Sequence, residues 1–134
     1  MIVVDASVLV MALAGPSDRG EAARSALFAD DDWAAPAHMP LEVVRTLHKA
    51  ARTKQLPPRD ADAAFQAMAA MQVSYVESDS LLLHTVWKLR HNLAVDDAAY
   101  LAVAALHAAP LVTFDARLAE GARQAMPKVD VTVL

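Results

Sequence analysis

Residues 2–10 read IVVDASVLV, and this stretch contains a clear transition from strand to helix. The β-branched run Ile2–Val4 is typical of a short buried strand. Asp5 comes directly after it, and the apolar segment Ser7–Ala14 predicts a helix. We therefore expect an acidic side chain at the carboxyl end of the first strand.

Residues 111–118, LVTFDARL, have the same organisation near the other end of the chain. The run Leu111–Phe114 predicts a second buried strand, Asp115 follows, and a helix is expected over 116–125. Strands that are apolar on both faces lie at the centre of parallel sheets, where ligands bind beyond the carboxyl ends. Asp5 and Asp115 are therefore expected to lie close together.

Strand and helix patterns alternate along the rest of the chain, which indicates an α/β sandwich with a mostly parallel sheet. Further strands are expected over 33–37, 73–76 and 129–133. Further helices are expected over 21–28, from Pro40 to about 51, over 59–71, from a cap at Ser78 or Asp79 to about 90, and over 97–109 with Asp96 as the cap.

Apolar residues at helical spacing predict which helix faces are buried. The helix that begins at Pro40 has a stripe formed by Leu41, Val44, Leu47 and Ala51. The helix over 59–71 is expected to turn Phe65, Met68 and Ala69 inward. The helix over 97–109 is apolar almost all round and is therefore expected to be central.

The length and composition of the chain exclude several classes of protein. Its 134 residues are expected to form one domain over residues 1–134, and the absence of cysteine excludes a disulfide scaffold, a thiolate metal site and a cysteine nucleophile. Sixteen acidic residues against twelve Lys and Arg give a net charge of −4, which argues against a general basic nucleic-acid binder. No targeting segment or membrane span is visible, so we expect a soluble cytoplasmic protein.

Two further acidic residues, Glu42 and Asp97, lie in the first turns of predicted helices. Together with Asp5 and Asp115 they place four carboxylates on four separate elements, and these elements could bring the four together on one spot. Such carboxylates repel one another unless a cation lies between them, and hard oxygen ligands suit Mg²⁺ or Mn²⁺. The sequence therefore points to an acidic metal site.

Each acidic residue also has a structural explanation when it is taken singly. Asp5 can form a turn with Ser7, and Asp115 can cap the helix that follows it. Glu42 can pair with Arg45 one turn later. Singly, each of these explanations is favoured over a functional role, and it is the joint placement of the four acidic residues together with their flanking sequence that favours a functional site.

Four segments of the chain resemble, in order and spacing, the conserved blocks of a PIN domain ribonuclease. They are residues 2–10 (IVVDASVLV), 40–47 (PLEVVRTL), 95–104 (VDDAAYLAVA) and 111–118 (LVTFDARL). The chain is similar over essentially its whole length to a single-domain VapC-type toxin. This resemblance implies a PIN-like three-layer α/β/α sandwich and a metal-dependent endoribonuclease that inhibits translation and growth.

The resemblance also assigns the residues of the site. It implies that Asp5, Glu42, Asp97 and Asp115 are the catalytic and metal-binding quartet, holding one or two Mg²⁺ or Mn²⁺ ions that activate water for attack on the scissile phosphorus. The family's Asp-Ala pair matches Asp97 rather than Asp96, which either caps its helix or assists the metal shell. Ser7 and Thr113 occupy the small polar positions near the first and last acidic residues. None of the five histidines shows metal-ligand spacing, so we interpret them as structural or surface residues.

The predicted partners are an RNA substrate and other protein chains. Arg45, Lys49 and Arg52 recur at helical spacing and form a candidate RNA-binding face, with a solvated helix face as the alternative. The resemblance implies a cognate VapB-type antitoxin that blocks the site, and a homodimer. Transfer, ribosomal and messenger RNA all remain open as substrates.

Three alternative functions remain at this stage. A haloacid dehalogenase-type phosphatase requires Asp-x-Asp after the first strand, where this chain has Ser7. A catalytically inactive PIN-like binding module is disfavoured by the intact quartet, and a receiver domain needs an acidic pair that Asp5-Ala6 does not supply. Without the quartet, twelve acidic residues balance the twelve Lys and Arg, so the net charge of −4 no longer argues against an RNA substrate.

Overall fold

The fold, described for residues 1–134 by a computed structural model, is built on a five-stranded sheet. The strands are β1 (Ile2–Val4), β2 (Trp33–Pro36), β3 (Ser74–Val76), β4 (Leu111–Thr113) and β5 (Val131–Val133). Their order is β3-β2-β1-β4-β5, and every neighbouring pair is parallel. The two strands that precede Asp5 and Asp115 are therefore adjacent at the centre, with Val4 opposite Val112.

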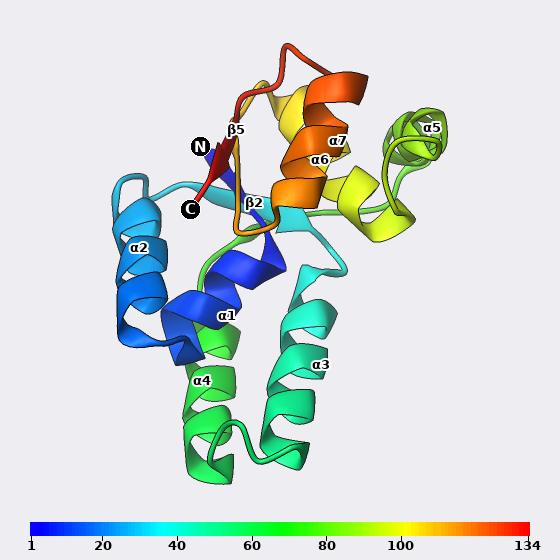
Figure 1. The fold of residues 1–134 in the computed structure, drawn as a ribbon. Coiled ribbons are helices and arrows are strands. Elements are labelled where there is room, and N and C mark those ends of the chain that lie inside the picture. The colour runs from blue at the N-terminus through cyan, green and yellow to red at the C-terminus, as the bar shows by residue number, and fades with distance from the viewer.

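Seven helices cover the two faces of this sheet (Figure 1). They are α1 (Ala6–Ala14), α2 (Ser17–Phe28), α3 (Met39–Arg52), α4 (Pro58–Ala70), α5 (Ser80–Leu89), α6 (Val95–His107) and α7 (Ala116–Ala125). Helix α1 packs against α2, α3 and α4 on one side, while α6 packs against α5 and the central strands on the other. The expected three-layer α/β/α sandwich is confirmed, and its sheet is parallel throughout.

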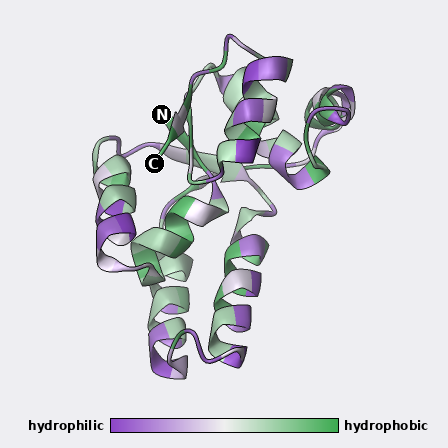
Figure 2. Cartoon of the chain, viewed as in Figure 1, coloured by the Kyte–Doolittle hydropathy of each residue, from purple (hydrophilic) through white to green (hydrophobic).

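The core lies where α6 meets the central strands. All seven residues from Ala98 to Ala104 are buried, which confirms the central position expected for this helix. Alanine occupies four of these positions, so the helix approaches the sheet closely while its first turn stays at the sheet edge. Figure 2 shows α1 mostly in hydrophobic colours, whereas hydrophilic colours gather on α7 and on the far ends of α3 and α4.

The predicted buried faces of α3 and α4 are partly wrong. In α3 the buried residues are Met39, Val43 and Leu47, and Leu41 is 68% exposed. In α4 Met68 is buried as expected, but Ala61 and Ala64 join it in place of Phe65 and Ala69. Both sets have helical spacing, and small alanine side chains allow the close contact of α4 with α1.

The caps of two helices resolve alternatives left by the sequence. Asp79, not Ser78, caps α5 and accepts a hydrogen bond from the Leu82 amide at 2.9 Å. Asp96 does not cap α6, because that position is occupied by Ala94 and the helix begins at Val95. Asp96 and Asp97 both lie in the first turn, so their carboxylates are available for other contacts. No helix has the length and apolar content that crossing a lipid bilayer requires.

Candidate active site

Asp5 and Asp115 lie at the carboxyl ends of the adjacent strands β1 and β4, as the sequence predicts. Asp5 is 7% exposed, which is unusual for a carboxylate. Asp115 is less buried and caps α7, accepting hydrogen bonds from the amides of Arg117 at 2.8 Å and Leu118 at 3.3 Å. The structural explanation for Asp115 therefore holds, but only its Oδ1 atom makes these bonds.

Two hydroxyl groups hold the Asp5 carboxylate in place. Its Oδ2 atom accepts hydrogen bonds from Ser7 Oγ at 2.7 Å and from Thr113 Oγ1 at 2.6 Å. The same hydroxyls accept bonds from the next strand end: Ser7 Oγ from the Phe114 amide at 3.2 Å, and Thr113 Oγ1 from the Asp115 amide at 2.9 Å. This network aligns β1 with β4 and leaves Asp5 Oδ1 without a hydrogen bond.

Asp97 is surrounded by the other acidic residues of the site. Burial and four nearby carboxylates raise its pKa from 3.8 to about 6, with burial the largest cause. The four carboxylates are those of Asp5, Asp115, Glu42 and Asp96. Because each of them acts on Asp97, the structure brings the whole predicted quartet together, with Asp96 beside it.

Glu42 is held by a tyrosine that the sequence did not single out. Tyr100 donates a hydrogen bond to Glu42 Oε2 at 2.6 Å, and burial together with this bond raises the tyrosine pKa. Tyr100 follows Asp97 by three residues and therefore shares its face of α6, a spacing that could have indicated this contact. No ion pair links Glu42 to Arg45.

His38, which the sequence indicates to be a structural or surface residue, lies beside Glu42. Its Nε2 atom lies 3.5 Å from Glu42 Oε1, and the ring meets Tyr100 edge to face. Ligand atoms of His38, Glu42 and Asp96 all lie within 4.8 Å of one another, and His38 Nε2 is buried without a hydrogen-bond partner. Asp96 thus faces the site rather than capping its helix.

The donor atoms of this site fit a hard divalent cation. Asp5 Oδ1 has no hydrogen bond, and the ionised form of Asp97 is disfavoured until positive charge is supplied. Carboxylate oxygens are the ligands preferred by Mg²⁺ and Mn²⁺. The geometry therefore suits metal binding better than an acid–base pair of carboxylates alone.

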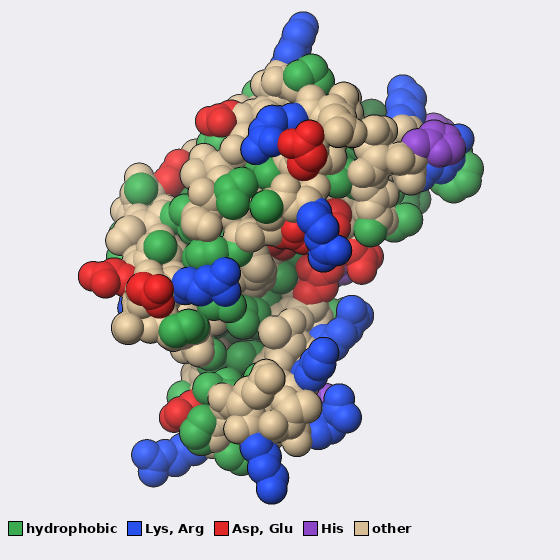
Figure 3. Space-filling view, viewed as in Figure 1, with side chains coloured by type: hydrophobic (Ala, Val, Ile, Leu, Met, Phe, Trp, Pro, Cys, Tyr) green, Lys and Arg blue, Asp and Glu red, His purple; other side chains and the backbone are tan.

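Of the three predicted RNA-binding residues, the structure brings one to the acidic residues. Arg45, Lys49 and Arg52 are all exposed on α3. Arg45 lines a cavity of about 320 Å³ together with Ser7 and Glu42, whereas Lys49 and Arg52 lie in the last turns of the helix. In Figure 3, Lys and Arg side chains border the red acidic patch above and below in the view.

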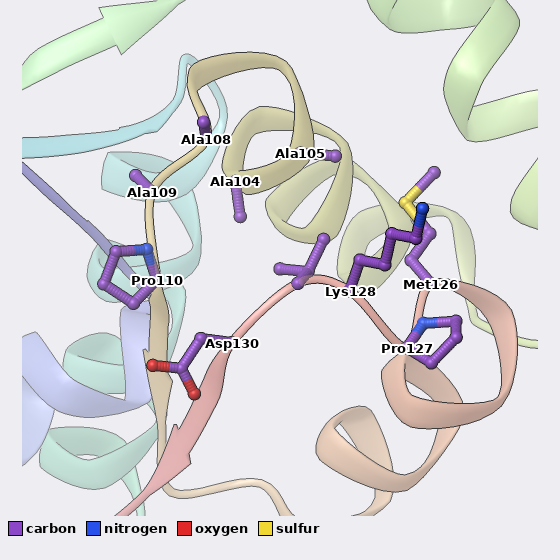
Figure 4. Close-up of a pocket in the computed structure, with 10 residues that line it drawn as sticks. Ala104, Ala105, Ala108, Ala109, Pro110, Met126, Pro127, Lys128 and Asp130 are labelled. Atoms are coloured by element: carbon purple, nitrogen blue, oxygen red, sulfur yellow. The ribbon is translucent and has the colours of Figure 1, made fainter.

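The largest cavity lies elsewhere, between the end of α6 and the segment that connects α7 to β5 (Figure 4). It measures about 550 Å³ and is lined mainly by apolar residues, among them Ala104, Ala108 and Met126. Lys128 and Asp130 supply its only charged groups. Because Pro110 precedes β4, this cavity is at the opposite end of the sheet from the acidic residues.

Comparison with known proteins identifies one family whose sequence pattern matches most of the chain. A family model described as the PIN domain matches residues 2–124. Ribonuclease VapC3 of Mycobacterium tuberculosis is 37% identical over 118 residues, which cover 88% of this chain and 85% of that protein.

Two solved structures have the same fold. The crystal structure of the Mycobacterium tuberculosis toxin VapC20 superimposes with a TM-score of 0.68 at 20% identity, covering 90% of this chain and 94% of that one. A toxin–antitoxin complex from Klebsiella pneumoniae gives a TM-score of 0.68 at 20% identity, covering 99% and 97%. The chain therefore belongs to the PIN domain family and groups within it with the VapC-type proteins.

Proposed function

We propose that this protein is an endoribonuclease that uses Mg²⁺ or Mn²⁺ and acts as the toxin of a toxin–antitoxin pair, slowing translation and growth. The observation that carries the proposal is that Asp5, Glu42 and Asp115 all lie near enough to Asp97 to raise its pKa, with Asp5 and Asp115 at the carboxyl ends of adjacent strands. The relative named ribonuclease VapC3 supports the reaction type. The family match over residues 2–124 supports one domain spanning residues 1–134.

The quartet holds the metal in this proposal. Asp5, Asp97 and Asp115 ligate one or two ions directly, and Glu42 either ligates or orients a water molecule. A bound divalent ion lowers the pKa of water and stabilises the charge that develops on the phosphate. Ser7 and Thr113 are positioning residues, because their hydroxyls hold Asp5 Oδ2 and leave Oδ1 free.

The orientation of the Glu42 side chain is set by residues other than those that hold Asp5. Tyr100 directs one carboxylate oxygen, Oε2, by donating to it, so that Oε1 remains for a ligand or a water molecule. Oε1 is the atom nearest His38, and Asp96 completes that group. Asp96 and His38 therefore extend the donor set beyond the quartet on the side of α3.

RNA reaches this site along α3 in the proposal. Arg45 lies in the cavity that also contains Glu42, where a guanidinium group is well placed to contact a phosphate next to the scissile bond. Lys49 and Arg52 continue the same exposed face away from the site, so they contact phosphates further along the chain. Their contribution is electrostatic and independent of base sequence.

A VapB-type antitoxin and a second copy of the chain are the proposed protein partners. The fold is shared with the toxin–antitoxin complex from Klebsiella pneumoniae, which supports an antitoxin partner. Large apolar side chains exposed on the surface supply area for such contacts. They include Leu41, Phe65, Leu81, Trp87 and Val95.

The decisive experiment compares the wild type with Asp5→Asn in cleavage of structured RNA with Mn²⁺. We expect cleavage by the wild type and by Asp62→Asn, an exposed acidic residue on α4, and none by Asp5→Asn with its fold intact. Circular dichroism verifies folding, and p-nitrophenyl phosphate is the control for phosphatase activity. Cleavage by Asp5→Asn at the wild-type rate rules out the proposed mechanism.

The RNA target requires a separate measurement. VapC20 is described as cleaving the sarcin–ricin loop, but at 20% identity the likeness shows the fold alone. Sequencing of RNA 5′ ends after induced expression distinguishes transfer, ribosomal and messenger RNA. Ends that appear with the wild type and disappear with Asp5→Asn identify the substrate.

A further inference from the structure

A second cavity, of about 410 Å³, borders the acidic residues on the side away from α3. It lies between the first turn of α2, the end of β4 and the start of α7. Its charged and aromatic lining consists of Arg19, Phe114, Asp115 and Arg117, with Ser7 at its edge.

The wall of this cavity contains a cation over an aromatic ring. The Arg19 guanidinium carbon lies 5.6 Å from the centre of the Phe114 ring. Arg19 is exposed and makes no hydrogen bond or ion pair, so Phe114 is its one specific contact. The backbone of Phe114 is fixed in position, because the residue directly follows β4 and its amide donates a hydrogen bond to Ser7 Oγ. A flat aromatic ring with a positive charge over it is well suited to stacking a nucleobase.

Arg117 supplies a second positive charge at the same cavity. Its side chain is 96% exposed, and its only carboxylate neighbour is Asp115 Oδ1, at 3.9 Å from Nε. Such an exposed and distant pair contributes little to stability. The guanidinium fork is therefore free to bind a phosphate in two places at once.

The two cavities meet at the catalytic residues. Ser7 lines both of them, and its hydroxyl donates to Asp5. One cavity contains Glu42 and Arg45, and the other contains Asp115 with Arg19 and Arg117. A polyanion that crosses Asp5 thus meets positive charge on both sides of the carboxylates.

We propose that Arg19, Phe114 and Arg117 form a binding site for one unpaired nucleotide next to the scissile phosphate. The base stacks on the Arg19–Phe114 pair, and Arg117 contacts the backbone phosphate. This inference rests on the proposed nuclease function and adds the residues that would hold the nucleotide beside the cleavage point. Bases inside a duplex are stacked on their neighbours and cannot reach the ring.

The test measures RNA binding separately from cleavage. Fluorescence anisotropy follows a labelled, unpaired RNA of about ten nucleotides on proteins that all carry Asp5→Asn, so that the RNA stays intact. Arg19→Gln and Phe114→Leu are compared with Arg90→Gln, a matched control because the Arg90 guanidinium lies 4.2 Å from the Trp87 ring on another helix. We expect both site variants to weaken binding about tenfold, as loss of one stacked base does, and the control to have no effect.

Two further measurements separate stacking from charge. Arg117→Gln is expected to reduce the slope of log affinity against log salt by about one, the effect of one lost phosphate contact. A duplex of the same sequence is expected to bind Arg19→Gln as well as it binds the parent. A melting temperature equal to that of the parent protein shows that Phe114→Leu is folded. If Phe114→Leu is not folded, the comparison of Arg19→Gln with Arg90→Gln is sufficient to test the proposal.

The outcomes distinguish this inference from the function on which it rests. If Arg19→Gln binds unpaired RNA as tightly as Arg90→Gln does, the nucleotide site is wrong even where the wild type cleaves RNA. If Arg19→Gln weakens duplex and unpaired RNA equally, the residue contributes charge only and the stacking proposal is also overturned. Failure of the wild type to cleave RNA with Mn²⁺, by contrast, contradicts the proposed function.

Discussion

Thr113 is a small buried residue on which both central carboxylates depend. Its hydroxyl donates to Asp5 Oδ2 and accepts from the Asp115 amide, so one atom sets the relative position of the two strand ends. Replacing it by valine keeps the shape, but it leaves the part-buried Asp115 amide without its acceptor and removes one of the two hydroxyl donors to the buried Asp5 carboxylate.

We expect Thr113→Val to lower the free energy of unfolding by about 1–3 kcal/mol, the cost of leaving buried polar groups unsatisfied. Urea denaturation measures this change, and Mn²⁺ titration is expected to show weaker binding because Asp5 is held by Ser7 alone. Thr113→Ser retains the hydroxyl and should restore both properties. Thr132→Val, at an exposed position on β5, controls for the substitution itself. Equal stabilities of Thr113→Val and Thr132→Val would contradict the proposed role.

Asp97 makes the stability of the metal-free protein depend on pH. Its pKa is raised from 3.8 to about 6 in the folded state, where it faces Asp5, Glu42, Asp96 and Asp115. The folded protein therefore binds this proton more tightly than the unfolded chain does. The contribution of this group to the free energy of unfolding is largest below pH 4 and decreases as pH rises to about 6.

Asp97→Asn removes the energetic cost of holding an ionised Asp97, partly buried, beside the other carboxylates. In EDTA at neutral pH we expect the variant to unfold at higher temperature than the wild type, although it loses cleavage activity. The difference should shrink as the pH falls from about 6 towards 4, where wild-type Asp97 becomes protonated. Thermal unfolding across this range checks the prediction, with Asp62→Asn as the control. A constant difference at all pH values would mean that the charge of Asp97 is not its cause.

At the scale of elements, short apolar runs followed by Asp were enough to locate the central strands. Residues 2–4 form a strand as predicted, and the strand expected over 111–114 ends one residue earlier, at Thr113. A run that is buried on both faces has few other structures open to it. The buried faces of the helices were harder to predict from the sequence. Leu41 and Met39 both continue a helical stripe, and the way α3 packs in the folded protein buries Met39 instead of Leu41.

The same limit applies to the candidate site. The four acidic residues could be predicted to converge because each lies at a strand end or a helix start. The spacing of Tyr100 from Asp97 indicates that they share a face of α6, but the contacts of His38 and Tyr100 with Glu42 depend on how α3 and α6 approach each other. The metal-binding and catalytic roles of all these residues remain predictions.

Gly121 allows α7 to approach the segment that leads into α6. A Cβ atom there would lie 2.5 Å from Leu93 Cδ2 and 2.9 Å from the Asn92 carbonyl oxygen. Leucine can change its rotamer, but the backbone carbonyl must shift, and overpacking of this kind costs about 1–3 kcal/mol. The contact matters for the site because α7 begins beside Asp115 and α6 carries Asp97 in its first turn.

We expect Gly121→Ala to destabilise the protein although alanine is favoured over glycine in helices by about 1 kcal/mol. It is also expected to weaken Mn²⁺ binding, because Asp115 and Asp97 move relative to each other. Denaturation and metal titration measure the two effects. Gln124→Ala, at an exposed position of the same helix, should change stability by less than about 0.5 kcal/mol. A Gly121→Ala variant that is more stable than the wild type would contradict this prediction, because it would show that residues 92–93 can move away at little energetic cost.

At the scale of the whole molecule, the net charge of −4 can be assigned to one region of the structure. The quartet contains four of the sixteen acidic residues, and the remaining twelve equal the number of Lys and Arg. The charge is therefore concentrated at one edge of the sheet, with Arg45 on one side and Arg19 and Arg117 on the other. Concentrated like charge opposes folding, and a bound cation removes that opposition.

This arrangement predicts that divalent metal stabilises the whole fold. Ligand that binds the folded state alone adds about 2.7 kcal/mol at one hundred times its dissociation constant. We therefore expect millimolar Mn²⁺ to raise the melting temperature of the wild type and of Asp62→Asn, and EDTA to reverse the rise. Asp5→Asn should show a much smaller rise, since it loses both a ligand atom and a charge. Sodium chloride at matched ionic strength measures general screening. An equal effect of sodium and manganese, or an undiminished rise in Asp5→Asn, would show that the carboxylates are an acidic surface rather than a metal site.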